Sequence, residues 1–426
     1  MKFKFFLLAA MSSLFVVKGA GQTVTVDGEV KSRGEIRNGF QNPLDKNLDT
    51  GFGGFLRTKL SASYSDEILS AKIGLINSNV YGQTPVNGAP AVGIAESWIA
   101  YNFTPEFSGT LGRMALSYDD GRLFSGNDFA ASPSSHDLLL LKYKSSQGFQ
   151  AHVGAAFSHN NDGNYFKDET YTSTSGYKSM YLLWLGQKVE KVNISGIFVN
   201  DNYHLQDTQP GYDANDPTLE SRFTVGLNFD MNEADTPISF HAGGYLQFGD
   251  DPNGKDLSTY YVNGKISYKF VPKFTVTAGA DIFSGTAYDE TKKNKTFNKL
   301  YGANHYSYGY MEYWTKIPNR GLAQWYIGVS GDITEKLNLS LNFNKLSTMK
   351  DFSATDDTRN LGSELDFMAR YNYSKNFLLE GGVSTYFKTD GTMLYKGMPV
   401  GLDVHTPLWA YLMITFRPTF FSTKVN

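Results

Sequence analysis

Basic side chains stand two residues apart at several places in the chain. Lys142 and Lys144 form one such pair, and Arg57 and Lys59 form another. Because residues two apart on a β-strand point to the same face, each pair would present both cations together. Fixed positive charges along a narrow passage attract anions and repel cations. The candidate pore-lining and solute-contacting residues are Arg33, Arg37, Arg57, Lys59, Lys72, Arg113, Lys142, Lys144, Arg222, Lys265 and Arg370.

Acidic residues stand on the same expected faces as these cations. Glu35 follows Arg33, and both Glu364 and Asp366 precede Arg370. Two interpretations therefore stay open. The cations are in excess and concentrate anions, or the charges pair across strands and only solvate the interior.

Other kinds of chemistry have little support in the sequence. Ser134–Asp137 contains the residue types of a hydrolytic triad, but neighbours on a strand point to opposite faces and cannot form the relay. The histidines lack metal-ligand spacing, and the chain has no cysteine. We therefore expect no catalytic residue, no metal and no cofactor. Calcium binding by the Asn/Asp-rich segment 158–169 stays open.

The composition favours strands and turns over helices. The 426 residues include 42 Gly, 27 Tyr and 31 Phe, and only 19% are charged. The formal net charge of -3 provides no basic footprint for nucleic acid, so no nucleic-acid partner is expected.

The amino terminus has the pattern of a secretory signal peptide. Lys2 and Lys4 form a basic start, and Phe5–Val17 is an apolar stretch too short to span a membrane. Gly19–Gly21 supplies small residues for cleavage. We assign 1–21 to the signal peptide and 22–426 to one exported domain.

Segments of the exported part alternate between apolar and polar residues with a period of two. Phe223, Val225 and Leu227 share one face, while Thr224 and Asn228 share the other. Segments of this length and pattern are typical of strands that cross a membrane in a barrel. The expected strands are 24–37, 52–64, 68–79, 92–103, 107–117, 135–144, 148–158, 177–187, 190–200, 220–230, 237–248, 258–270, 273–285, 322–331, 336–347, 361–373, 376–387 and 407–417.

The connections between these strands alternate between short and long. That alternation predicts an all-β fold: a single transmembrane antiparallel β-barrel of about eighteen strands, with short periplasmic turns and long extracellular loops. Tyr301–Trp314 is aromatic enough to be a further strand, but an odd count would put the chain ends on opposite sides. We therefore assign 286–321 to one long loop, a candidate constriction of the pore.

Aromatic residues gather where the expected strands meet the short turns. Such rings suit the headgroup layer of a membrane and form girdles around barrels. β-Propensity alone does not explain why they cluster at one end. The expected periplasmic girdle comprises Tyr64, Phe103, Tyr143, Phe229, Phe270, Tyr373 and Phe416.

Two patches of sequence resemble the alginate export family of outer-membrane barrels. Gly112–Leu123 reads Gly-Arg-Met-Ala-Leu-Ser-Tyr-Asp-Asp-Gly-Arg-Leu and precedes a Ser/Asn/Asp-rich segment. Leu300–Gly309 carries the pattern Leu-Tyr-x-x-x-His-x-x-x-Gly. The loop residues that carry the resemblance are Tyr118, Asp120, Arg122, Tyr301 and His305.

The resemblance implies an eighteen-stranded barrel whose Arg/Lys-lined lumen conducts an anionic polysaccharide. From the residues alone, Asp120-Gly121-Arg122 is a turn. Two roles for Arg122 stay open. It braces the turn through charge-assisted hydrogen bonds, or it clamps a carboxylate.

These expectations describe an outer-membrane channel of a Gram-negative bacterium. Polar solutes, including anionic ones or a polysaccharide, would cross by passive diffusion through a charged lumen. The partners would be outer-membrane lipid and the solute, and no particular oligomeric state is indicated. Two alternatives stay open: a barrel-type outer-membrane enzyme, and a structural or adhesive barrel plugged by its loops.

Overall fold

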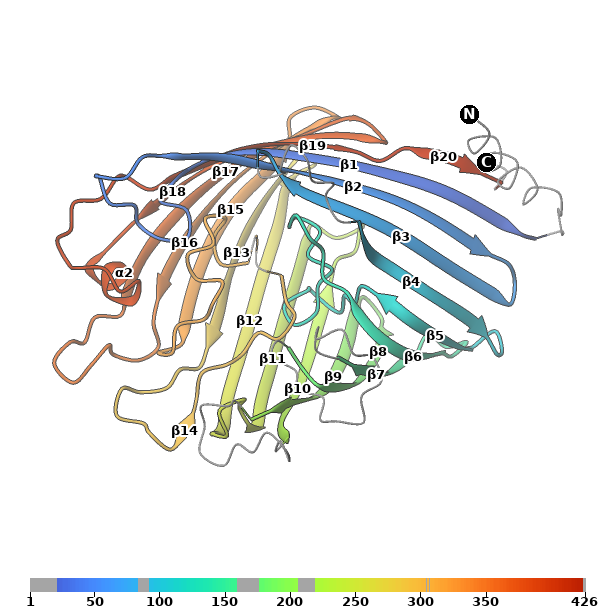
Figure 1. Ribbon diagram of the computed structural model, residues 1–426, viewed down its shortest axis with the longest axis horizontal. Coiled ribbons are helices and arrows are strands. Elements are labelled where there is room, and N and C mark those ends of the chain that lie inside the picture. The colour runs from blue at the N-terminus through green and yellow to red at the C-terminus, as the bar shows by residue number, and fades with distance from the viewer. Residues whose placement is uncertain are drawn as a thin grey trace.

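The chain winds into one barrel of antiparallel strands (Figure 1). The computed structural model describes residues 21–82, 92–158, 176–205, 219–303, 305 and 307–423. The expected signal peptide, apart from Gly21, lies outside the described residues, as does the segment 158–169 apart from Ser158.

Eighteen strands make up the wall, which is closed. The first strand, Thr23–Asn38, pairs with the second and also with the last, Leu408–Phe416. Closure leaves no free sheet edge, as a membrane requires. The wall strands are β1 (Thr23–Asn38), β2 (Gly51–Ser65), β3 (Leu69–Val80), β4 (Gly93–Asn102), β5 (Phe107–Met114), β6 (His136–Lys144), β7 (Gln150–Phe157), β8 (Ser179–Val189), β9 (Val192–His204), β10 (Leu219–Met231), β11 (Ile238–Asp250), β12 (Asp256–Val271), β13 (Phe274–Phe283), β15 (Leu322–Asp332), β16 (Leu337–Ser347), β17 (Asn360–Ser374), β18 (Phe377–Phe387) and β19 (Leu408–Phe416).

The predicted number of wall strands is confirmed, and most predicted bounds agree within a few residues. Tyr301–Trp314 lies in the connection between β13 and β15, which pair directly, so it is not a wall strand. Two strand ends differ by three residues or more: β9 runs to His204 instead of residue 200, and β5 ends at Met114 instead of residue 117. β5 ends early because the chain there leaves the wall and turns into the lumen (Figure 1).

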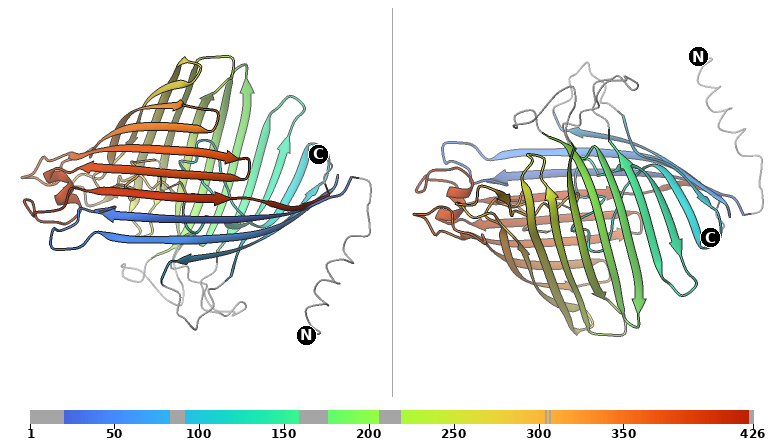
Figure 2. Two further views of the ribbon diagram at one scale, coloured as in Figure 1. Left: turned by 90° about the horizontal axis from the view of Figure 1, so that it is seen from above. Right: turned by 90° about the horizontal axis from the view of Figure 1, so that it is seen from below.

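Three short elements were not predicted: β14 (Lys293–Asn294), α2 (Asp390–Tyr395) and β20 (Thr419–Ser422). β20 pairs with residues Thr25–Asp27 and extends the seam of the barrel beyond β19. At that end the two views of Figure 2 place β20 beside the start of β1. No helix among the described residues is long and apolar enough to cross a membrane.

The two faces of each wall strand differ in burial, and the apolar face is the exposed one. In β10, Leu227 is 56% exposed, whereas Thr224 and Asn228 are 0% and 2% exposed. Apolar residues therefore point outwards and polar residues inwards, the reverse of a water-soluble barrel. An outward apolar band surrounding a polar interior is the arrangement that a lipid bilayer selects.

The expected aromatic girdle is on the outer surface. Phe103, Tyr143, Phe270 and Tyr373 are exposed at strand ends next to short turns, by 55%, 42%, 48% and 61%. Tyr64 is only partly exposed, and its hydroxyl donates a hydrogen bond to Asp66 at 2.6 Å. The amphipathic rings thus lie at one level, where the apolar band meets the headgroups.

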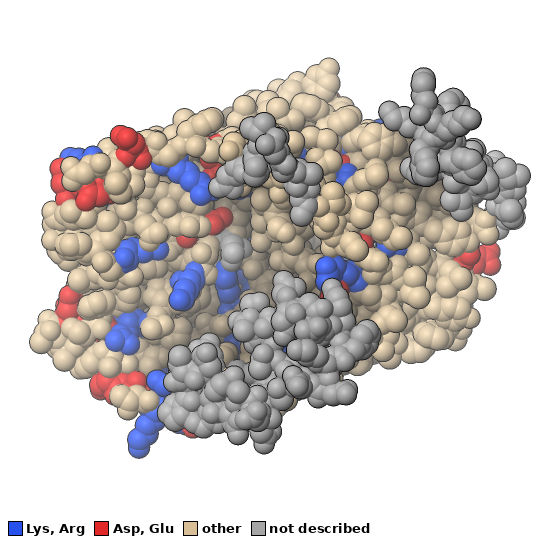
Figure 3. Space-filling view, viewed as in Figure 1, with Lys and Arg blue, Asp and Glu red and all other residues tan. Residues whose placement is uncertain are grey.

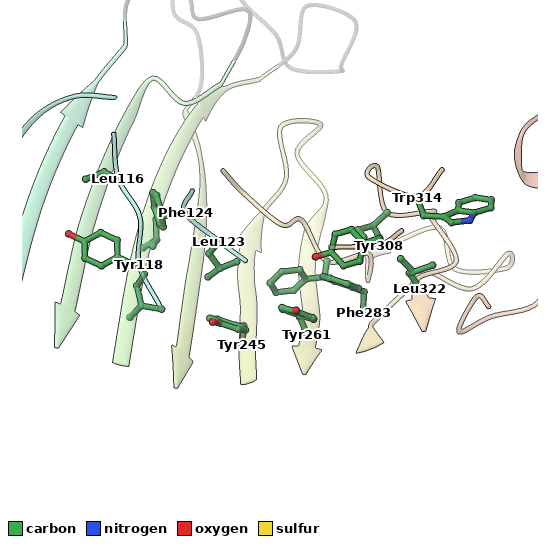
Figure 4. Close-up of a cluster of buried hydrophobic side chains, with 14 of the residues drawn as sticks. Leu116, Tyr118, Leu123, Phe124, Tyr245, Tyr261, Phe283, Tyr308, Trp314 and Leu322 are labelled. Carbon is green, nitrogen blue, oxygen red and sulfur yellow. The ribbon is translucent and has the colours of Figure 1, made fainter. Parts of the chain in front are cut away.

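The hydrophobic core lies inside the barrel, where inward side chains of the wall strands pack against two inward connections. We call residues 115–135, between β5 and β6, the first inner loop, and residues 284–321, between β13 and β15, the second inner loop. Figure 4 shows Leu123 and Tyr308 of these loops near rings that project from β11–β13, and Phe124 next to Tyr118. Those wall rings form a stack: Tyr245 lies 5.5 Å from Tyr261, and Tyr261 lies 4.0 Å from Phe283.

Gly112 shapes β5 just before the first inner loop, and its replacement should destabilise the barrel. Its φ is +130°, and a Cβ there would lie 2.2 Å from the Ser97 carbonyl oxygen. We expect Gly112→Ala to cost roughly 3 kcal/mol of unfolding free energy, from backbone strain and the clash. Urea unfolding of the refolded protein in lipid, followed by tryptophan fluorescence, measures this.

Gly34→Ala is the matched control, because Gly34 also lies in a wall strand and a Cβ there has nothing within 4 Å. Equal midpoints for the two variants would contradict the assigned role of Gly112.

Candidate functional site

The two inner loops meet in the middle of the lumen. The Tyr301 N–H donates to the Leu123 carbonyl at 2.9 Å, and the Ser125 N–H donates to the Tyr301 carbonyl at 3.2 Å. Gly302 permits this approach, since a Cβ there would lie 2.0 Å from the Arg122 carbonyl oxygen. The two sequence patches that were singled out separately therefore form one structure inside the barrel.

Arg122 braces the first inner loop. Its Nη2 lies 3.0 Å from Asp281 Oδ2 on β13, and its Nε lies 3.3 Å from Asp120 Oδ2. Asp120 in turn lies 3.2 Å from Nε2 of His241 on β11. Because both carboxylates and the guanidinium are largely buried, this geometry supports the bracing role of Arg122 over a carboxylate clamp.

Tyr118 and Asp119 fix the same loop to the wall at β7–β10. The Tyr118 hydroxyl lies 3.1 Å from Nδ1 of His152. The Asp119 carboxylate accepts hydrogen bonds from Trp184 Nε1 at 3.1 Å and from Asn228 Nδ2 at 3.1 Å. All the donors that reach this carboxylate, including the Ser195 hydroxyl, are neutral.

Asp128 fixes the tip of the first inner loop to the wall at β1 and β2. Its carboxylate lies 3.0 Å from Lys31 Nζ, 2.6 Å from Arg57 Nη2 and 2.7 Å from Arg417 Nη2. Although burial alone would raise it, the charges of Lys31 and Arg57 hold the pKa of the Asp128 carboxyl well below its usual range. Next to it, the Phe129 ring stacks on His305 of the second inner loop, with centroids 3.6 Å apart.

The second inner loop is fixed to the opposite part of the wall. Glu364 of β17 accepts the Met311 N–H at 2.8 Å. Gly309, with φ +89°, leaves no room for a Cβ, which would lie 2.5 Å from the Glu364 carboxylate. Trp314 donates its indole N–H to the Tyr386 hydroxyl at 2.8 Å. The two loops together reach from β1 across the lumen to β10 and β17, and so set its narrow section.

Strand register places most of the candidate pore-lining residues on the inner faces of the wall. Arg57 lies opposite Lys31, and Lys142 lies opposite His152, which contacts the first inner loop. The candidates on inner faces are Arg33, Arg37, Arg57, Lys59, Lys72, Lys142, Lys144, Arg222, Lys265 and Arg370.

Arg113 is the exception, and its predicted place in the pore is wrong. It lies in register with Ser97 and Asp137, on the opposite face of β5 from the buried Thr110 and Met114. On that outer face its guanidinium donates to Asp137 at 2.7 and 2.6 Å. The prediction took Arg113 from the Gly-Arg pattern without fixing which side chains of the strand point inwards.

Acidic residues neutralise much of the basic wall. The ion pairs are Arg33–Glu35 and Arg37–Glu35 (each 2.7 Å), Arg57–Glu29 (2.7 Å), Lys72–Glu96 (2.6 Å), Arg370–Glu380 (3.2 Å) and Arg222–Asp201. By contrast, Lys142, Lys144 and Lys265 have no carboxylate within 4.0 Å in the part of the chain that the structure describes. Ion pairing within and between strands therefore neutralises most of the candidate cations of the wall, and only the unpaired ones are left to attract anions.

An external pocket lies on the extracellular side of the inner loops. Its volume is ≈ 510 Å³, and Trp314, Tyr395, Arg320 and Lys396 are among its lining residues. Arg320 donates to the carbonyls of Thr286 and Phe352 at 3.1 and 3.3 Å. Lys396 Nζ donates to the Tyr313 carbonyl and lies 4.5 Å from the centre of the Trp314 ring.

Arg320 and Lys396 are thus held by neutral groups. Glu312 and Lys316 also line the pocket, and the Glu312 carboxylate accepts a hydrogen bond from Gln41 at 3.0 Å and lies 3.2 Å from Nδ1 of His305. Burial lowers the pKa of Lys396 to about 8.

Figure 3 shows Lys and Arg side chains gathered around the hollowed middle of one face of the molecule, with Asp and Glu mostly towards the left edge.

Two smaller pockets lie on the periplasmic side of the inner loops, near the short turns. One has a volume of ≈ 340 Å³ and is lined by Asp119, Trp184 and polar residues of β9–β11. The other has a volume of ≈ 280 Å³ and is lined by Lys31, Asp128, Arg417 and residues of β17–β19. Polar space therefore exists on both sides of the narrow section.

The structure does not assemble the residue types of a hydrolytic triad at Ser134–Asp137. His136 points inwards and lies 3.0 Å from the Tyr177 hydroxyl, whereas Asp137 points outwards. Among the residues described, no group of three or more His, Asp or Glu side chains could hold a metal ion.

Sequence reasoning missed Asp128, Asp201 and Lys396. Asp201 lies on the inner face of a predicted strand region, and extending that strand by a few residues would have found it. Asp128 and Lys396 lie in irregular loops, where no spacing rule assigns a direction to a side chain.

Comparisons with known proteins agree with this geometry. The sequence profile of the family described as Alginate export matches residues 76–391. No curated protein sequence matches the chain.

Solved structures of similar fold include three from Gram-negative bacteria. OpdL of Pseudomonas aeruginosa has a TM-score of 0.62 at 12% identity, over 93% of this chain and 99% of that one. OccAB1 of Acinetobacter baumannii has a TM-score of 0.61 at 12% identity, over 95% and 99%. The outer membrane protein OpdK of Pseudomonas aeruginosa has a TM-score of 0.61 at 10% identity, over 93% and 99%.

The structural likeness concerns the fold, while the profile match covers well over half of the sequence. The structure agrees with that profile match. It is a closed eighteen-stranded barrel with an outward apolar band, and inner loops narrow its polar lumen. The chain belongs to the alginate export family and is a channel of the Gram-negative outer membrane.

Proposed function

We propose that this channel passes polar solutes that carry negative charge, up to short acidic oligosaccharides, by passive diffusion and without catalysis. The observation that carries the proposal is the external pocket. There Arg320 and Lys396 face solute space, and neither has a carboxylate within 4.0 Å among the described residues. A cation bonded only to neutral groups keeps its attraction for an anion.

The other residues of the external pocket suit a sugar-like solute. Trp314 and Tyr395 supply ring faces, while Gln41, Asn42 and Asn319 supply amide groups that can bond hydroxyls. A uronate sugar presents an apolar ring face, hydroxyls and a carboxylate, so it can use all three kinds of contact. The family's description, Alginate export, names an anionic polysaccharide of this chemistry.

The paired charges of the wall limit how strongly the channel selects anions. Ion pairs such as Lys72–Glu96 offer donors and acceptors to a polar solute but little net potential. Lys142 and Lys265 add positive charge at separate places on the wall. We therefore expect weak anion preference in salt and stronger discrimination between solutes that fit the external pocket.

Single-channel recording of the refolded protein in planar bilayers tests this function directly. We expect a steady conductance. In asymmetric KCl the reversal potential should have the sign that indicates mild anion selectivity. A short oligouronate should block the current. A neutral oligosaccharide of equal length should block less, because it lacks the carboxylates. Absence of any conductance would contradict the proposal and favour a barrel plugged by its inner loops.

The charge of Lys396 should set the pH dependence of block. Because its pKa is lowered to about 8, the side chain is charged below that pH and loses its charge as pH rises through it. Oligouronate block should therefore weaken between pH 7 and pH 9. Lys396→Met should weaken block at pH 7 roughly tenfold, the worth of one charge-assisted contact, and remove this pH dependence.

Lys388→Met is the matched control for that measurement. Lys388 is exposed, belongs to the same extracellular connection and does not line the external pocket. If oligouronate blocks the Lys396→Met and Lys388→Met channels equally well, the external pocket does not bind the solute.

A further inference from the structure

Four cations on one part of the wall converge on a single carboxylate of the first inner loop. Asp128 Oδ1 lies 2.6 Å from Arg57 and 4.0 Å from Lys59. Asp128 Oδ2 lies 3.0 Å from Lys31 and 2.7 Å from Arg417. Each oxygen of the carboxylate thus faces its own cations, as in a binding site for a free carboxylate.

The two sides of this contact differ in burial. The Arg57 and Lys31 side chains are 0% and 3% exposed and that of Lys59 is 23% exposed, whereas those of Arg417 and Asp128 are 48% and 57% exposed. Lys31 and Arg57 therefore belong to the fixed wall, and the carboxylate approaches them from the open side. Buried cations left without an anion are costly, so something negative must occupy this position.

We propose that Asp128 is an internal ligand in a carboxylate-binding site formed by Lys31, Arg57, Lys59 and Arg417, and that a carboxylate of the solute displaces it. The inference rests on the proposed function, because it needs anionic solutes to reach the narrow section. It adds a second binding site, separate from the external pocket, and a way in which the solute itself widens the passage.

The charge balance of the site favours a second anion. Glu29 is the other carboxylate in contact, 2.7 Å from Arg57 and 2.8 Å from Arg417. The four cations exceed these two carboxylates even while Asp128 is in place. An anion that enters the adjacent ≈ 280 Å³ pocket meets Lys31 and Arg417 on its lining, together with Asp128 and the Arg370–Glu380 ion pair. It can therefore approach before Asp128 leaves.

Several of the contacts that hold the tip of the loop are ones that a solute can replace, while the Phe129 ring also packs against Trp409 and Tyr411. Lys31 Nζ donates to the Asp128 carbonyl at 2.7 Å, Arg57 Nη1 donates to the Ala130 carbonyl at 2.8 Å, and Arg33 Nη1 donates to the Phe129 carbonyl at 3.0 Å. These cations are the donors, and a hydroxylated carboxylate offers oxygen acceptors of the same kind. When oxygens of the solute replace the loop carbonyls as acceptors, the buried cations keep their hydrogen bonds.

Release of the tip would also change the contact between the inner loops. Phe129 lies between the Arg33 guanidinium, 4.0 Å from its ring centre, and the stacked His305 ring of the second inner loop. Moving Asp128 away from the wall moves its neighbour Phe129 out of this position. The space between the inner loops then widens next to the bound solute.

Removal of the internal carboxylate is the first test. Asp128→Asn should shift the reversal potential in asymmetric KCl towards greater anion selectivity. It should also let succinate, used as the carboxylate probe, bind at about tenfold lower concentration, as read from current block. Asp119→Asn is the matched control, since Asp119 lies in the same loop but accepts only from neutral donors. Asp128→Asn behaving like this control would overturn the proposal.

Locking the tip is the second test. Ser78 of β3 donates to the Ala131 carbonyl, and the chain has no cysteine of its own, so Ser78→Cys with Ala131→Cys provides a clean pair. When oxidised, the double variant should conduct but lose the response to succinate, and reduction should restore it. An oxidised channel that responds like the wild type would show that the tip does not leave.

These outcomes separate the two proposals. A wild-type protein without conductance would contradict the proposed function itself. A wild-type channel blocked by oligouronate, with Asp128→Asn and the locked pair both indistinguishable from it, would overturn only the role of Asp128. Heat-dependent migration on a gel verifies that each variant has folded as a barrel.

Discussion

Most of the charges that point into this barrel lie within an ion pair, and that pairing determines much of the interior. The wall carries cations on inner faces where water is limited, and an unpaired buried charge is far more costly than a paired one. Some of the carboxylates that neutralise these cations lie on the same strand, as Glu35 does for Arg33. The rest comes from the first inner loop, where Asp128 meets the cations of β1 and β2 and Arg122 meets Asp281. Charge pairing therefore both neutralises the wall and fixes the narrow section.

The aromatic residues have two distinct places, and the same residue types serve both. Outside, rings such as Phe103 and Tyr373 lie at the lipid interface. Inside, Tyr245, Tyr261 and Phe283 form a stack that supports the inner loops. An amphipathic ring suits both places, because each combines an apolar contact with a nearby polar group. The high aromatic content of the chain therefore reflects a packed lumen as well as a membrane surface.

The wall could be predicted from sequence, whereas the path of the inner loops could not. Alternation with a period of two is a local signal, so residues such as Phe223, Val225 and Leu227 reveal both a strand and its outer face. The loop contacts join distant residues: Arg57 and Asp128 are 71 positions apart, and Arg122 and Asp281 are 159 positions apart. The motif residues were recognised, but their meeting inside the lumen depends on closure of the whole barrel. Arg113 shows the same limit at small scale, since a one-residue difference in register decides which face a side chain occupies.

The alternation seen in β10 has a consequence for how the protein reaches its membrane. Because every second side chain of such a strand is polar, the extended polypeptide is only moderately apolar along its length. The continuous apolar surface comes into being when neighbouring strands align and their outward residues merge into a band. Before that alignment the chain meets water as a moderately polar polymer. Its affinity for lipid is thus a property of the assembled wall, acquired where assembly takes place.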